Sequence, residues 1–303
     1  ISGPEKGKKV VALYEEAIAG KLKAGDVVVV DKTGGEQENY FIVEPYRINQ
    51  LILFVLIFFA VAIYFGRRRG VFAIIGLIIS ILIIFYFLIP QMIAGKSPLA
   101  TALIAALLIT ITSLFVAHGV TKRTTVAFAG TVISLGITVI VDLILVYSTK
   151  LTGNSSEEAM FLQLGDKPFD LQSVLLAGIL IGVLGILDDI TTAQAACVEE
   201  IHAANPTFTR KELYRRGLSV GREHIASLVN TIVLVYVGVS LPLILLFVSN
   251  KGGSLWVVMN SGFIAEEIVR TLVGSLVLVI AVPLTTFLAA YYYSGRLAKG
   301  SLG

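Results

Sequence analysis

The stretch GILDDITTAQ, residues 185–194, decides how this chain is organised, because two adjacent carboxylates follow one of its most apolar runs. Hydrophobic residues make up 56% of the 303 residues, and charged residues make up only 15%. Soluble domains average about 25% charged residues, and the mean hydropathy of this chain is +0.86. The composition therefore indicates an integral membrane protein, in which an Asp-Asp pair needs a physical reason.

Apolar runs long enough to cross a bilayer recur along the chain. A hydrocarbon core of about 30 Å needs about 20 predominantly apolar residues per helix. The predicted spans cover residues 50–66, 70–89, 99–117, 125–147, 171–187, 226–248 and about 268–291. The last span follows an interfacial segment at 254–265, which contains Trp256. We therefore expect a mainly α fold, a polytopic helical membrane protein with about seven spans.

Positively charged residues are distributed unevenly between the two sets of loops. One set carries Arg67, Arg68, Arg69, Lys122, Arg123, Arg210, Lys211, Arg215, Arg216, Arg222, Arg296 and Lys299. The opposite short loops carry only Lys96, Lys150, Lys167 and Lys251. Because Lys and Arg are enriched in cytoplasmic loops, we expect the C-terminus inside the cell and residues 1–47 outside.

Residues 1–47 differ in kind from residues 48–303, which form the predicted transmembrane helical domain. Val27–Val30 and Tyr40–Val43 are short β-rich runs. These runs predict a small extracytoplasmic β-rich module, for which a structural cap is the simplest role. Because the chain begins at Ile1 without Met, we also expect an upstream signal or anchor.

A cytoplasmic helix is expected between the fifth and sixth spans. Thr209 and Glu212 have the spacing of a capping box. Leu213, Tyr214 and Leu218 then share one apolar side. This pattern predicts an amphipathic helix at about 209–225, lying along the inner headgroups.

The Asp188–Asp189 pair leaves two structures open. Carboxylates are unfavourable at a helix C-terminus and favourable at an N-terminus because of the helix dipole. We therefore expect the fifth helix to break near its inner end, with one carboxylate facing Asn230 across a polar cavity. Asp188 and Asp189 are then the candidate metal ligands, since carboxylate and amide oxygens suit protons and hard cations. The alternative is a plain helix cap at the water interface.

Asp142 lies in the outer third of the fourth predicted span. An ionisable side chain within a span is a candidate for an ion or substrate pathway. Arg270 is its predicted partner, and Arg270 also has the spacing to pair with Glu266 or Glu267 in its own helix. A structural ion pair is the other interpretation of these residues.

Several blocks of the sequence resemble the YibE/F-like family of bacterial membrane proteins. They are LKAGDVVVV, YFIVEPYR, GVLGILDDITTAQAACVEEIHAANP, LYRRGLSVGREHIASLVNTIVLVYVGVSLP and EEIVRTLVGSLVLVIAVPLT. The resemblance covers nearly the whole chain and implies a leading anchor helix and a multi-pass protein of the bacterial cell membrane. Many members carry one Asp where this chain has two. Transport is the activity that the resemblance implies.

Two functions from different classes remain open. The first is a membrane transporter or channel for a small cation or a proton-coupled solute. The alternative is a non-transporting accessory or scaffold for secretion or envelope assembly. An intramembrane aspartic hydrolase is disfavoured, because Asp142 and Asp188 each lie about 26 Å from the start of oppositely directed helices, whereas a catalytic dyad needs its carboxylates in contact. We therefore expect no enzyme.

The expected partners follow from the same reasoning. They are the lipid bilayer and a small ion or solute, and they can include a second copy of the chain in a homo-oligomer. No nucleic acid is expected. No cofactor is evident in the sequence, although a bound cation is compatible with its carboxylates.

Overall fold

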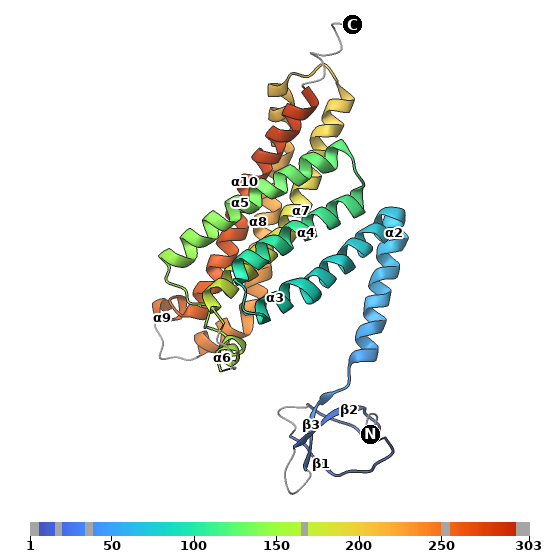
Figure 1. Cartoon of the computed structure of the whole chain (residues 1–303), viewed down its shortest axis with the longest axis vertical. Helices are drawn as coiled ribbons and strands as arrows, with labels where there is room; N and C mark the ends of the chain where they lie inside the picture. Colours follow the sequence, from blue (N-terminus) through green and yellow to red (C-terminus); the bar gives the residue numbers. More distant parts are fainter. Residues whose placement is uncertain (1–5, 16–19, 34–38, 165–168, 250–254, 295–303) are drawn as a thin grey trace. The chain divides into compact units, whose positions relative to one another are not determined.

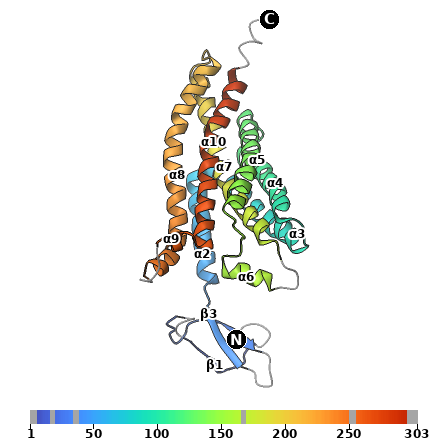
Figure 2. The ribbon, with the colours of Figure 1, turned by 90° about the vertical axis from the view of Figure 1, so that its left-hand side faces the viewer.

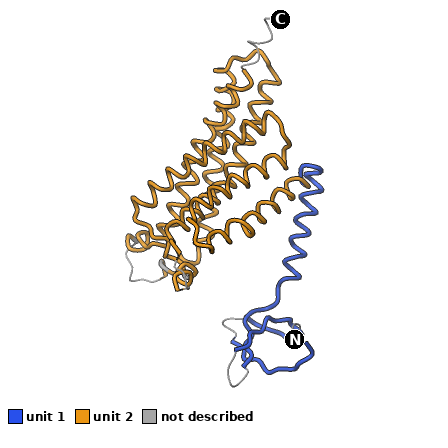
Figure 3. The backbone as a smooth tube through the Cα atoms, in the orientation of Figure 1, with its two compact units in different colours: residues 1–70 blue, residues 71–303 orange. Residues whose placement is uncertain are grey.

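The computed structural model describes residues 6–15, 20–33, 39–164, 169–249 and 255–294. It divides into two compact units, residues 1–70 and residues 71–303 (Figure 3). Four residues of the charge pattern, Lys167, Lys251, Arg296 and Lys299, lie outside the described residues.

The first unit contains a three-stranded sheet of β1 (Ala12–Leu13), β2 (Val28–Thr33) and β3 (Asn39–Pro45). β3 is central, parallel to β1 and antiparallel to β2. Tyr40 is buried in this sheet, and its hydroxyl accepts a hydrogen bond from Lys8 Nζ at 3.1 Å. The two predicted β-rich runs are confirmed as β2 and β3.

A long helical stretch follows the sheet: α2 (Ile48–Ile83), the π-helix η1 (Ile84–Leu88) and α3 (Ile89–Ile93). It is kinked at Arg67, which has a φ of 50°. A Cβ atom added to Gly70 would collide with the backbone carbonyl of Ala62. The chain therefore needs a glycine three residues after this kink.

The remaining helices build the bundle of the second unit. They are α4 (Pro98–His118), α5 (Lys122–Ser148), α6 (Glu157–Gln163), α7 (Leu171–Ala204), α8 (Arg210–Ser249), α9 (Leu255–Met259) and α10 (Gly262–Ser294). α7 and α10 lie at the centre, with α8 on one side and α5 and α4 on the other (Figures 1 and 2). α7 and α10 thus contribute much of the buried core.

Six helices among the described residues are long and apolar enough to cross a membrane. They are Ile48–Ile93, Pro98–His118, Lys122–Ser148, Leu171–Ala204, Arg210–Leu246 and Gly262–Ser294. The count differs from the seven predicted spans because the spans expected at 50–66 and 70–89 lie in one helical stretch. The kink at Arg67 falls where those two predicted spans meet.

The predicted break at Asp188–Asp189 is wrong, because α7 continues through both residues to Ala204. The expectation assumed that the helix ends near residue 187, where the dipole would oppose carboxylates. In the continuous helix the two carboxylates lie well before its C-terminus. The Thr192 hydroxyl donates to the Asp188 and Asp189 carbonyl oxygens at 2.8 and 3.0 Å, so it supports the existing turn.

The amphipathic helix predicted at about 209–225 does not lie apart from the sixth predicted span. Both belong to one continuous helix, α8. Its capping box is confirmed: Thr209 N donates to Glu212 Oε2 at 2.8 Å, and Glu212 N donates to Thr209 Oγ1 at 3.3 Å. Its apolar side packs against protein instead of headgroups. Leu213 is fully buried in a cluster with Val198 of α7 and Ala289 of α10.

The last span starts earlier than predicted. α10 begins at Gly262, whereas the sequence indicated a span from about residue 268. The expected interfacial segment contains α9 and then runs into α10. Trp256 on α9 is 79% exposed, and its place at a membrane interface stays a prediction.

Close approach of α8 to α7 and α10 depends on two glycines. A Cβ atom on Gly217 would lie 2.7 Å from Val198 Cγ2, and one on Gly221 would lie 3.0 Å from Gln194 Oε1 and overlap Val282. Small residues are the usual means of close helix contact in membranes. The two glycines therefore set the position of α8 in the bundle.

Gly221→Ala is expected to destabilise the protein by about 1–3 kcal/mol, the usual cost of overpacking. Thermal unfolding in detergent micelles, followed by circular dichroism, measures the change. Gly185→Ala is the matched control, because a Cβ at that helical position meets nothing within 4 Å and should increase stability by up to about 1 kcal/mol. Equal melting temperatures for the two variants would contradict the packing argument.

Candidate functional site

A stripe of polar side chains runs along the buried face of α5. Thr131, Ser134, Thr138 and Asp142 follow one another at spacings of three and four residues, and each has no exposed surface. Such spacing places side chains on one side of a helix. This side faces α7 and α10, the helices against which α5 packs.

Asp142 is the ionisable member of this stripe. Both of its carboxylate oxygens are buried, and neither has a hydrogen-bond partner among the described residues. An unpaired buried carboxylate is costly, because burial removes its hydration. A buried group that lacks such partners is a candidate binding group for a proton or an ion.

Arg270 of α10 is the charged neighbour of Asp142, and it connects Asp142 to Glu267 and Tyr236. The positive charge of Arg270 acts on the Asp142 carboxylate, and both Arg270 and Glu267 act on Tyr236 of α8. Arg270 Nε lies 3.5 Å from Glu267 Oε1. We call Asp142, Tyr236, Glu267 and Arg270 the Asp142 cluster; it joins α5, α8 and α10.

Two glycines of α7 line the same cluster. A Cβ added to Gly178 would lie 3.7 Å from Arg270 Nη1, and one added to Gly182 would lie 3.7 Å from the Tyr236 hydroxyl. α7 thus presents only backbone at these positions, which leaves room for the two long side chains.

Of the two predicted pairings of Arg270 within its own helix, the structure contains the one with Glu267. Glu266 instead accepts a hydrogen bond from the Ser155 hydroxyl at 2.7 Å. Neighbouring residues on a helix point about 100° apart, so the two glutamates face different partners.

Asp188 and Asp189 lie further along α7 and have different surroundings. Asp188 is partly buried next to Ser113 of α4, its hydrogen-bonding neighbour, while its Oδ1 atom has no partner among the described residues. Asp189 interacts electrostatically with His118 at the end of α4. The partners of this pair therefore come from α4, which the sequence did not indicate for Asp188.

Asp189 also lines a cavity of about 320 Å³ between α7 and α8. The α8 side of this cavity includes Leu228, Thr231 and Ile232, whereas Asn230 is exposed on that helix. The prediction that Asn230 faces the carboxylates across this cavity is therefore wrong. The adjacent residue, Thr231, takes that place because it points in a different direction around the helix.

Gln194 is a buried residue that the sequence analysis did not single out. Its Nε2 atom donates to the Gly217 carbonyl at 2.8 Å and to Thr286 Oγ1 at 2.7 Å. One turn earlier on α7, the Thr191 hydroxyl shares a hydrogen bond of 2.8 Å with Thr131. An amide within a run of alanines was the only signal in the sequence. These groups form a second polar level, away from the Asp142 cluster.

The described residues contain no group of three or more His, Cys, Asp or Glu side chains arranged to hold a metal ion. Asp188 and Asp189 are adjacent but have different partners. Asp142 is accompanied by a cationic neighbour, Arg270. A cation bound at any of these carboxylates remains a prediction.

Arg270→Ala is expected to reduce the amount of folded protein more than Arg270→Lys does. The alanine leaves Asp142 and Glu267 without their cation, whereas lysine keeps the charge. An isolated charge within a membrane is costly. The yield of monodisperse protein after size-exclusion chromatography measures the effect, and wild-type yields for both variants would contradict a structural role for the ion pair.

Comparison with known proteins agrees with the membrane architecture. A sequence model of the family described as YibE/F-like protein matches residues 54–295, which is most of the chain and includes all the residues of the Asp142 cluster. Comparison with curated proteins and with solved structures finds no match. The chain belongs to the YibE/F-like family.

Proposed function

We propose that this protein is a membrane transporter or channel that moves a proton, or a small cation, across the bilayer, alone or coupled to a solute. The observation that carries the proposal is the fully buried Asp142 carboxylate, which has no hydrogen-bond partner among the described residues. An ionisable group in such a place is typical of ion and proton pathways in membrane proteins.

The charges around Asp142 support uptake of one positive charge. When ionised, Asp142 and Glu267 carry two negative charges and Arg270 carries one positive charge, so their sum is −1. One proton or one monovalent cation neutralises this sum. Electrostatic interactions are strong in an apolar surrounding, so the occupied and empty states of the cluster favour different packing.

The polar stripe of α5 supplies a route away from the cluster. Asp142 and Thr131 are eleven residues apart, about 16 Å at 1.5 Å per residue. Thr131 contacts Thr191 at the second polar level, next to Gln194. Between the two levels, α7 and α10 contribute Val183, Leu187 and Val277 to the hydrophobic core.

We also propose a bacterial cell-membrane location with residues 1–47 outside and the C-terminus in the cytoplasm. The uneven distribution of Lys and Arg supports this orientation. The kink at Arg67 supports two crossings within Ile48–Ile93, and therefore seven crossings in all.

Asp142→Asn is expected to reduce proton flux at least tenfold, because an amide of the same size cannot gain and release a proton. Pyranine fluorescence in proteoliposomes with an imposed pH gradient measures the flux, and parallel Na⁺ and K⁺ gradients test the small cations. Asp188→Asn is measured in the same assay, because Asp188 is a partly buried carboxylate on α7. Glu200→Gln, an exposed carboxylate on α7, is the matched control.

Two results of this assay would change the proposal. Wild-type flux in Asp142→Asn would give Asp142 a purely structural role. If the wild-type protein carries no flux with any of the gradients, a non-transporting accessory becomes the better explanation.

The orientation predicts that Lys32→Cys reacts with a membrane-impermeant maleimide added outside intact cells, and that Arg216→Cys reacts only after the cells are opened. Cys197→Ala serves as the cysteine-free background, since Cys197 is the only cysteine. Labelling of both positions from the same side would refute the proposed topology.

A further inference from the structure

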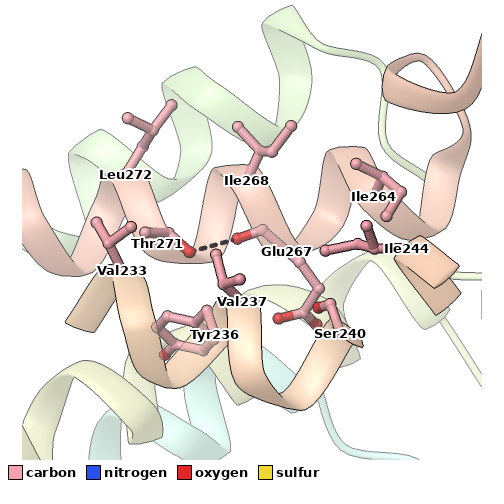
Figure 4. Close-up of a pocket in the computed structure, with 10 residues that line it drawn as sticks. All are labelled: Val233, Tyr236, Val237, Ser240, Ile244, Ile264, Glu267, Ile268, Thr271 and Leu272. Atoms are coloured by element: carbon pink, nitrogen blue, oxygen red, sulfur yellow. Dashed lines mark hydrogen bonds between the residues drawn. The ribbon is translucent and has the colours of Figure 1, made fainter. Parts of the chain in front are cut away.

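A cavity of about 210 Å³ lies between α8 and α10, at the level of the Asp142 cluster. Most of its lining is aliphatic, including Val233, Val237 and Leu272. Tyr236, Ser240 and Glu267 add an aromatic ring, a hydroxyl group and a carboxylate (Figure 4). An apolar cavity with a few polar groups that fix orientation is the usual form of a small-molecule site.

The Ser240 hydroxyl is a buried polar group that the fold does not use. Ser240 is 6% exposed, and its Oγ atom has no hydrogen-bond partner among the described residues. By contrast, the Thr271 hydroxyl bonds to the Glu267 carbonyl of its own helix at 2.7 Å (Figure 4). Leaving a buried hydroxyl unpaired costs about 1–3 kcal/mol, so Ser240 favours a ligand that can pair with it or bring water.

The Glu267 carboxylate can interact with a cationic ligand despite its ion pair. Its Oε1 atom is 3.5 Å from Arg270 Nε, longer than the 2.7–2.9 Å of a charge-assisted hydrogen bond. Arg270 Nε also has no hydrogen-bond partner among the described residues. The pair is therefore loose, and the Glu267 carboxylate can attract a second cation.

Tyr236 supplies a second attraction for a cation. Its ring lines the cavity, and the face of an aromatic ring attracts ammonium groups by about 0.5–2 kcal/mol. The cavity volume sets the size of the ligand, because an apolar cavity of about 150 Å³ is enough to hold benzene. The cavity thus fits one aromatic ring or a few short alkyl groups together with a small ammonium head.

We propose that the cavity between α8 and α10 binds a small organic cation with an apolar body, whose ammonium group lies between Glu267 and Tyr236. The statement that this cation is the solute of coupled transport rests on the proposed function. The binding itself requires no transport. Glu267 gives the charge preference, Tyr236 and Ser240 orient the head group, and the aliphatic wall accepts the apolar body.

Benzyltrimethylammonium is the probe that tests this site. Isothermal titration calorimetry with the full chain in phosphatidylcholine nanodiscs measures its binding, with empty nanodiscs as the blank. Benzyl alcohol has the same ring without a charge and is expected to bind at least tenfold more weakly. Equal affinity of the two probes, or no binding of the cation, would overturn the proposal.

Three variants locate the site and its charge. Glu267→Gln removes the carboxylate and is expected to weaken binding of the cation at least tenfold. Val237→Phe fills the cavity from a position that is 44% exposed, so it should prevent binding while leaving the Glu267–Arg270 pair intact. Glu266→Gln is the matched control, since Glu266 bonds to Ser155, and its affinity should stay within twofold of wild type.

The pattern across the variants separates this inference from simpler explanations. Unchanged affinity in Glu267→Gln, with loss in Val237→Phe, would show that the cavity binds the probe through its apolar wall alone and would overturn the inference. An equal loss of affinity in Glu266→Gln would show that binding depends on the overall negative charge and not on Glu267. That result would also overturn the inference. If Glu267→Gln does not fold, Val237→Phe and the two probes still decide the outcome.

The outcome also differs from that of the flux assay. Binding of benzyltrimethylammonium in a protein that carries no flux would leave this site standing and remove the proposed transport. Proton flux that depends on Asp142, without binding of the probe, would support transport and remove this site.

Discussion

The contact on which the rest of the bundle depends is made by the side chain of Gln194. Its amide donates to the Gly217 carbonyl of α8 and to Thr286 of α10, so one side chain joins three helices. Gln194 and Thr286 have no exposed surface, so water does not compete for these bonds. α8 is therefore held at this level, while cavities separate it from α7 and from α10 further along its length.

This arrangement divides the polar groups of the interior into two levels. The Asp142 cluster forms one level, and Gln194 with the Thr131–Thr191 pair forms the other. Between them, α5 contributes the buried side chains of Ser134 and Thr138. The helices between them contribute apolar side chains such as Leu187 and Val277 to the core. A charge that passes from one level to the other must be accompanied by a change in packing, because close-packed interiors shift between discrete arrangements. If the protein transports an ion as we propose, the two-level interior therefore suits a cycle of conformations better than a permanently open pore.

The sequence could predict those features that depend on residues close together in the chain. Apolar runs of span length, the β-rich segments and the i,i+3 spacing of Glu267 and Arg270 obey local rules. The continuation of α7 through Asp188 could not be predicted from a rule about helix ends, because it depends on how far the helix extends and on neighbours in α4. Gln194 was missed for a related reason: its importance depends on Gly217, which lies 23 residues away in the sequence.

The unexpected continuity of α7 and α8 has a mechanical consequence. At 1.5 Å per residue, their 34 and 40 residues give lengths of about 51 and 60 Å, well beyond a hydrocarbon core of about 30 Å. The extra length of α8 lies at its N-terminal end, which carries Arg210 to Arg222. At the same end of the bundle, the Tyr293 hydroxyl of α10 donates a hydrogen bond to Glu199 of α7 at 2.9 Å. α8 therefore connects the basic end of the bundle directly to the wall of the cavity at Tyr236 and Ser240. Because α8 is unbroken between its basic end and Ser240, a tilt of α8 about its contact with Gln194 would move the basic end. The same tilt would change the volume of the cavity next to Glu267.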